Sequence, residues 1–328
     1  MLSGLEFGLL LHTRHLIRGD RGASGRTELD AFWATAERAE TDGYDHLWTG
    51  DSPRISQLDR AHADCLTIMA GLAARTGKIR IGAVPLIAAL RNPVLLAHSL
   101  ATLDVISDGR LLVGVSAAPQ YKYAEREFAA CGVPFAERAG RLEESIGVMR
   151  RLWTEESFSF QGKYYSWPEI GIQPRPARQS IPIWIAAGDN ENALRRAALL
   201  GDGWFTVAPT LETYLARRQK IDRFARAAGR DLGNFSSALF ATFHLSAGAG
   251  AEEEGWTLAE RYFRQPRAQL KHLSPFFGTP EDSAKKLQGY VDAGLTAVVA
   301  RFVAADVAGQ TRMLLNEVKP RLKMPVRG

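Results

Sequence analysis

The chain of 328 residues contains only two cysteines, Cys65 and Cys131, so it has no disulfide framework. No uncharged apolar run reaches the roughly 18 residues that a helix needs to cross a bilayer. Residues 1–6 do not lead from a basic segment into an apolar one, so no secretory signal is expected. These absences favour a protein of the reducing cytoplasm that has no membrane partner.

The chain also lacks the features of a nucleic-acid-binding protein. Its 41 Lys and Arg against 36 Asp and Glu leave a net charge of +5, without a basic tail. Arginine pairs such as Arg217-Arg218 lie in helical patterns, where solvated faces explain them. Hydrophobic residues make up 46% of the chain, which permits a sizeable core and argues against disorder. We therefore expect a small-molecule substrate and no nucleic acid.

Motifs of several enzyme classes are missing as well. The sequence contains no GxSxG elbow, no P-loop and no HExxH segment. The seven histidines form no tight ligand set, so no dedicated metal site is expected. Residues 12–19, after the first expected strand, lack the GxGxxG pattern of a doubly wound dinucleotide-binding sheet. That open sheet is therefore only the second choice of fold.

Short apolar runs alternate with longer segments of helical period, the pattern of parallel βα units. Asn92-Pro93 and Thr279-Pro280 each read as a helix N-cap followed by proline at the first helical position. The expected strands are 5–11, 44–49, 79–87, 110–116, 183–187, 203–207, 237–245 and 297–303. Eight strands, each followed by a helix, predict a single (β/α)8 TIM barrel over residues 1–328, an α/β fold.

Long connections interrupt this alternation. An insertion at about 154–182 contains a hairpin pattern around Gln161-Gly162, and one at about 246–278 contains an amphipathic helix near 256–263. The connection 12–27 includes four arginines, Arg14, Arg18, Arg21 and Arg26. Loops that follow barrel strands lie at the C-terminal mouth, where active sites of this fold are built. We expect loop 246–278 to close over the site and exclude water.

Segments spread over most of the chain resemble the bacterial-luciferase-like flavin-dependent oxidoreductases. The first is GYDHLWTGD at 43–51, and the others are 91–93, 101–110, 132–138, 141–144, 173–176, 181–188, 197–204 and 278–281. The resemblance implies a barrel that pairs as a homodimer and binds a flavin-type ring at its mouth. Family members use reduced FMN with oxygen, or a deazaflavin coenzyme for hydride transfer. In both cases the coenzyme carries out the redox chemistry, and the protein binds and positions the coenzyme.

On this resemblance the chain is expected to be an FMN-dependent monooxygenase. Reduced FMN from a separate flavin reductase would react with oxygen and oxygenate a small organic substrate. The first alternative is a deazaflavin-dependent oxidoreductase, and the second is a flavin-binding barrel without turnover. Several hydride-transferring members have Asp-His after strand two, with histidine as the acid-base group, whereas this chain has Asp51-Ser52. That departure favours the monooxygenase.

The resemblance assigns the ring to a bulge in strand three, which often contains a cis peptide. Matched on Asn92-Pro93, the bulge falls at Val84-Pro85. A cis bond before proline costs only about 0.5–1 kcal/mol, so we predict a cis Val84-Pro85 bond. Ser116 falls where some members place a small residue near the reactive carbon of the ring. The alternative for Ser116 is a strand-end hydroxyl with a local partner.

The coenzyme phosphate is assigned to Ala187-Gly188-Asp189-Asn190, between strand five and its helix. A helix N-terminus suits an anion because its free N–H groups and dipole are positive. We expect Asn190 and the backbone amides to bind the phosphate while Asp189 caps the helix and faces away. Plain helix capping by this segment is the alternative.

Three residues at expected strand ends are candidates for catalysis. His244 matches a position where some monooxygenases keep a histidine that stabilises a flavin peroxide or exchanges a proton, and its alternative is a buried core residue. Arg301 is a candidate to hold an anionic substrate or the phosphate, and a buried ion pair is its alternative. His12 is a weaker candidate of the same kind. Asp51 and Trp204 complete the expected coenzyme site, with Trp204 either lining the pocket or filling the core.

Overall fold

A computed structural model describes residues 4–13, 24–52, 62–120, 123–248 and 250–324, with only the backbone of 24–27. The arginines expected in the first long connection, Arg14, Arg18, Arg21 and the side chain of Arg26, lie outside the described residues. The chain forms two compact units. Unit 1 comprises 1–10, 38–47 and 186–328, and unit 2 comprises 11–37 and 48–185. Within the described ranges, no helix is both long and apolar enough to span a membrane.

The strands pair in the order β10-β9-β11-β1-β2-β3-β4-β7-β8, and β8 pairs with β9 as well, so the order closes on itself. The recorded pairs of this sheet, such as β3 with β4 and β11 with β9, are parallel. Apart from β10, the strands of this sheet are eight in number, and they alternate with helices along the chain. This is the topology of a (β/α)8 barrel, and it confirms the predicted fold class.

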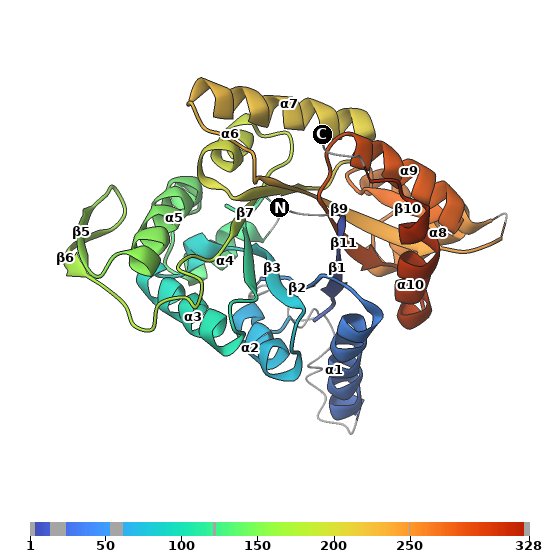
Figure 1. Cartoon of the computed structure of the whole chain (residues 1–328), viewed down its shortest axis with the longest axis horizontal. Helices are drawn as coiled ribbons and strands as arrows, with labels where there is room; N and C mark the ends of the chain where they lie inside the picture. The colour runs from blue at the N-terminus through green and yellow to red at the C-terminus, as the bar shows by residue number, and fades with distance from the viewer. Residues whose placement is uncertain (1–3, 14–23, 53–61, 121–122, 249, 325–328) are drawn as a thin grey trace. The chain divides into compact units, whose positions relative to one another are not determined.

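Unit 2 supplies the strands and helices around β3 and β4, and α1 (Ser24–Asp42) and β2 (His46–Thr49) contribute to both units. Its other elements are α2 (Cys65–Arg75), β3 (Arg80–Leu86), η1 (Ala88–Leu90), α3 (Pro93–Ile106), β4 (Leu111–Val115), α4 (Ala124–Ala130), η2 (Phe135–Glu137), α5 (Arg138–Thr154), β5 (Phe158–Gln161), β6 (Ser166–Ile170) and most of β7 (Ile183–Ala186). Figure 1 shows the β5–β6 hairpin extending beyond α5, as the Gln-Gly pattern predicted. The core packs tightly, because a Cβ on Gly82 would lie 2.4 Å from the buried ring of Trp48.

Unit 1 follows the same alternation. It contains β1 (Glu6–Leu11, the last residue in unit 2), α6 (Glu191–Leu200), β8 (Gly203–Thr206), α7 (Leu211–Ala227), β9 (Ser236–Leu245), α8 (Ala251–Phe263), η3 (Arg267–Gln269), β10 (Pro275–Gly278), α9 (Pro280–Asp292), β11 (Ala297–Phe302), α10 (Val307–Met313), η4 (Leu314–Val318) and η5 (Lys319–Arg321). The predicted caps form as expected: Asn92 accepts from Val94 N–H in unit 2, and Thr279 accepts from Asp282 N–H here. These caps fix where α3 and α9 begin.

One expectation for unit 1 was wrong. Segment 246–278, interpreted as a loop with one helix, also contains β10, which pairs with β9 from Pro275↔Thr242 to Gly278↔Leu245. Four residues between two turn signals are too few for a periodic pattern to show. The tightly packed α8, η3 and β10 give the 246–278 segment a core of its own, centred on Ala259, Leu270 and Leu273.

Candidate active site

β3 ends in a bulge at the predicted position. Its pairing with β4 shifts register between Ala83 and Leu86, and the Val84–Pro85 peptide is cis, as predicted. At the end of the neighbouring β4, Ser116 N–H donates to Leu86 O at 3.0 Å. The Ser116 hydroxyl accepts from Ala118 N–H at 3.0 Å, so this hydroxyl has the local strand-end partner of the alternative interpretation. Ser116 still lies beside the bulge that the resemblance assigns to the ring.

Asp51, directly after β2, holds the chain that leaves β3. Its carboxylate accepts from Ile87 N–H at 2.9 Å and from both terminal nitrogens of Arg91 at 2.7 and 2.9 Å. Burial, and then the charge of Asp51, raise the pKa of the Cys65 thiol well above its ordinary value. Both carboxylate oxygens of Asp51 are thus engaged within unit 2. Asp51 therefore fixes the position of the β3 end.

His62, which no sequence pattern indicates, lies beside Gly50, which follows β2. A Cβ on Gly50 would lie 3.6 Å from Cε1 and 3.7 Å from Nε2 of His62, and 3.8 Å from the carbonyl oxygen of Val84. The other ring nitrogen, Nδ1, lies 3.4 Å from Thr13 Oγ1 and 3.3 Å from Ala63 O. From the sequence alone, His62 is distinguished only by its place in the connection that follows the second predicted strand. The predicted candidate His12 is partly buried, next to Thr13 at the end of β1.

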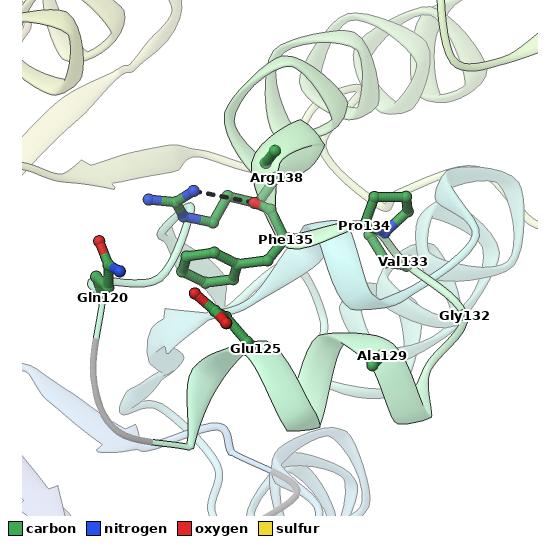
Figure 2. Close-up of a pocket in the computed structure, with 9 residues that line it drawn as sticks. Gln120, Glu125, Ala129, Gly132, Val133, Pro134, Phe135 and Arg138 are labelled. Carbon is green, nitrogen blue, oxygen red and sulfur yellow. Dashed lines mark hydrogen bonds between the residues drawn. The ribbon is translucent and has the colours of Figure 1, made fainter.

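A pocket of about 630 Å³ opens beside the turn that follows β4 (Figure 2). Its wall is formed by α4, η2 and the start of α5, and its main polar or aromatic lining residues are Gln120, Glu125, Phe135 and Arg138. The Arg138 guanidinium lies 3.8 Å from the centre of the Phe135 ring and donates to Phe135 O at 2.9 Å. It also donates to Ala118 O at 3.3 Å. Arg138 therefore links the pocket wall to the turn after Ser116.

In unit 1, the turn between β7 and α6 has a different cap from the one expected. Asn190 Oδ1 accepts from Ala193 N–H at 2.9 Å, so Asn190 is the N-cap of α6. Asp189, expected to cap, instead accepts from Nε and Nη2 of Arg217, both at 2.9 Å. Asn190 takes the cap because its extended backbone directly precedes the first helical residue.

Arg217 was interpreted from the sequence as part of a solvated helix face, which is wrong. Its side chain is 8% exposed, whereas that of Asp189 is 84% exposed. Arg217 also donates to Thr206 Oγ1 at 2.9 Å and to the carbonyl of Val207. The hydrogen bond from Arg217 lowers the pKa of Asp189, so this carboxylate is ionised at neutral pH. A fixed, buried cation therefore already holds one anionic oxygen at this turn.

The residues flanking this turn are structural. Trp204 is fully buried, and its Nε1 donates to Ala187 O at 2.9 Å. Its ring stacks on Tyr214, with 5.3 Å between the centroids. Ala187 N–H in turn donates to Phe205 O at 3.2 Å. Trp204 thus fills the core, as its alternative interpretation stated, and it fixes the backbone from which Gly188 follows.

The predicted candidates His244 and Arg301 share one face of the unit 1 strands. Phe243 stacks on Phe276, whose ring lies next to Tyr290 of α9, so Phe243 points toward the helices. Because side chains alternate along a strand, His244 points to the opposite face. Arg301 pairs in register with Thr242 and therefore lies on that same face.

Arg301 is held rather than extended toward solvent. Its Nη2 donates to Thr242 Oγ1 at 2.7 Å, and its guanidinium lies 4.8 Å from the Phe240 ring and 4.6 Å from the Phe263 ring. Such a stack suits a guanidinium well. His244 Nε2 lies 3.2 Å from a carboxylate oxygen of Glu254 on α8. Both residues are at most 8% exposed. Among the described residues neither ring nitrogen of His244 has a partner in hydrogen-bond geometry, and the contacts of Arg301 include a hydroxyl and two aromatic rings.

Comparisons with known proteins agree with this architecture. A family profile described as "Luciferase-like monooxygenase" matches residues 5–274. The F420-dependent glucose-6-phosphate dehydrogenase of Amycolatopsis mediterranei (strain U-32) is 28% identical over 318 residues, which cover 88% of this chain and 93% of that protein. A solved F420-dependent secondary alcohol dehydrogenase in complex with an F420-acetone adduct has a TM-score of 0.81 at 20% identity, covering 98% of this chain and 100% of that one. Monooxygenase RslO1 from Streptomyces bottropensis has a TM-score of 0.81 at 23% identity, covering 96% and 99%.

The closed parallel topology is that of a (β/α)8 barrel, and the family match identifies it as an oxidoreductase. The chain belongs to the luciferase-like monooxygenase family, as the sequence resemblance predicted. This family includes enzymes that use a flavin and enzymes that use a deazaflavin coenzyme.

Proposed function

We propose that this protein is a deazaflavin-dependent oxidoreductase that transfers a hydride between an F420-type coenzyme and a small organic substrate. The main support is its likeness, over most of both chains, to an F420-dependent dehydrogenase. The anion-holding turn after β7 fits the phosphate of such a coenzyme. The FMN-dependent monooxygenase expected from the sequence becomes the second candidate. It is favoured by Ser52, which stands where several hydride-transferring relatives have histidine, and it would need a separate flavin reductase.

The phosphate would bind at residues 187–190. The first N–H groups of α6 have no partners within their helix, which makes this end of the helix attractive to an anion. A Cβ on Gly188 would approach nothing nearer than Nη2 of Arg217, at 4.0 Å, so the turn has room for a ligand. The carboxylate of Asp189 on Arg217 is a chemical stand-in for a phosphate oxygen. We expect the phosphate to take the place of Asp189 on Arg217.

The ring would contact Val84, Pro85 and Ser116. When bound, the coenzyme supplies the site that accepts or releases the hydride. The protein contributes a rigid platform, because Asp51 and Arg91 fix the chain that leaves β3. The pocket with Glu125 and Arg138 offers both an anionic and a cationic group to a polar substrate.

A homodimer is part of this proposal. α3 exposes three large apolar side chains, Leu95, Val105 and Ile106, to 68%, 47% and 53%. Isolated apolar residues are common on surfaces, but three on one helix suit a contact with a second copy. Light scattering at micromolar protein would give twice the chain mass of 36.0 kDa.

Coenzyme binding tests the proposal. Titration with F420, followed by fluorescence, should show saturable binding, and reduced FMN under anaerobic conditions should bind more weakly. Arg217→Met should weaken F420 binding roughly 10–100-fold, because a hydrogen bond to a charged group contributes about 1.5–3 kcal/mol. Arg218→Met is the matched control, since the neighbouring Arg218 pairs with Asp222 and Ser237 instead. Binding of FMN alone would overturn the deazaflavin assignment and support the monooxygenase.

A further inference from the structure

We propose that His62 is the proton-exchanging catalytic residue of this enzyme, in place of the histidine that Ser52 replaces. This inference rests on the proposed hydride transfer and deepens it. His62 belongs to the connection between β2 and α2, and its ring reaches back to the strand ends of unit 2. Thr13 follows β1, Gly50 follows β2 and Val84 lies in the bulge of β3. The ring is close to Thr13 and Gly50, and Gly50 in turn is close to Val84 O.

The contacts of Nδ1 select the tautomer of His62. Ala63 O, at 3.3 Å, accepts hydrogen bonds and cannot donate one. The Nδ1 position must therefore hold the proton when this bond forms. The Thr13 hydroxyl, at 3.4 Å, is able to accept from the same N–H. In the neutral ring the lone pair then lies on Nε2, which makes Nε2 the basic nitrogen.

Nε2 and Cε1 lie on the side of the His62 ring that faces Gly50. Nε2 would be 3.7 Å from a Cβ on Gly50, and that Cβ would be 3.8 Å from Val84 O. A side chain at position 50 would therefore contact both the His62 ring and the carbonyl of the bulge. Gly50 leaves this position open, next to the residues to which the ring of the coenzyme is assigned.

The proton balance of an alcohol oxidation defines the role. The hydride leaves the carbinol carbon for the coenzyme, the O–H bond breaks, and a C=O bond forms. The hydroxyl proton passes to Nε2 of His62. The resulting imidazolium keeps its Nδ1–H bond to Ala63 O, so the ring does not have to turn during the step. Reduction of a carbonyl compound runs the same transfer in reverse, with His62 as the acid.

Two measurements test this role without depending on turnover. Nitrogen NMR of histidine-labelled protein, assigned with His62→Asn, should show Nε2 as the unprotonated nitrogen, and F420 should shift its resonance. Diethyl pyrocarbonate should modify His62, and saturating F420 should protect it, with exposed His272 as the unprotected control. A protonated Nε2 in the neutral ring, or no response of His62 to bound F420, would overturn the inference. Failure of F420 to bind in the fluorescence titration would instead overturn the proposed function.

Turnover gives the third measurement, with F420 and either 2-propanol or glucose 6-phosphate as the probe substrate. His62→Asn should bind F420 within about 3-fold of the parent and lose roughly 100-fold or more in kcat, the range of general acid-base catalysis. Added imidazole should restore part of that rate. His272→Gln should change neither value. An unchanged kcat in a folded His62→Asn protein that binds F420 would contradict the role.

Discussion

Removing the Asp51 carboxylate should destabilise unit 2 more than any ordinary surface change. Asp51→Ala deletes the acceptor of Ile87 N–H and of two Arg91 nitrogens. Breaking a buried ion pair by removing one partner costs about 3–5 kcal/mol, because the remaining charge is left without compensation. The Arg91 side chain is 23% exposed and also approaches Asp64 at 3.4 Å, so we expect the lower end, about 3 kcal/mol. For a chain of this size that corresponds to a fall in Tm of roughly 4 °C.

Urea unfolding and thermal melts of two further variants test whether the lost stability comes from the buried carboxylate of Asp51. Asp51→Asn keeps an acceptor for Ile87 N–H and should lose about half as much stability. Asp64→Ala is the control, since Asp64 is 54% exposed and its main role is to cap α2, which contributes about 1 kcal/mol. The reasoning is refuted if Asp51→Ala costs no more than Asp64→Ala.

Three other outcomes are expected. The Glu144 carboxylate accepts hydrogen bonds from the backbone N–H groups of 163–165 at 2.7 to 3.3 Å. Glu144→Ala should therefore speed amide hydrogen exchange in the β5–β6 hairpin, while α3 keeps its protection. Hairpin exchange rates equal to those of the parent protein would contradict this. Partial burial, and then the charge of Arg301, lower the pKa of His272 below its ordinary 6.5. The unfolded chain therefore takes up this proton first as pH falls, so the free energy of unfolding decreases as the pH falls below about 6.5. His272→Gln should show a smaller drop in Tm over that range, and parallel curves would exclude the effect. Leu95→Glu should convert the proposed dimer to a monomer in light scattering, and a persistent dimer would place the interface elsewhere.

Local signals in the sequence predicted local structure well. The caps at Asn92 and Thr279 formed where the patterns placed them, because a cap depends on a side chain and on backbone amides two or three residues away. The alternating apolar runs predicted the eight barrel strands, since buried parallel strands need such runs whatever their neighbours are. The bulge and the cis Val84–Pro85 bond followed from the spacing to Asn92 that the family resemblance provided.

The contacts of the candidate site were harder to predict. Arg217 is one of two adjacent arginines on a helix, and only the packing of α7 against the β7–α6 turn buries it on Asp189. His62 lies 13 residues beyond the end of the predicted strand 44–49, in a segment without a helical or strand period. Its approach to Gly50 therefore depends on the folded path of the chain. Roles that depend on such long-range contacts leave no periodic trace in one sequence.

A crystal structure of the protein with F420 would test the central claim most directly. The account predicts the ring of the coenzyme against Val84 and Pro85, with its phosphate on Arg217 and Asp189 displaced from that guanidinium. Ring density elsewhere, or a phosphate away from residues 187–190 with the Asp189–Arg217 pair intact, would contradict the account.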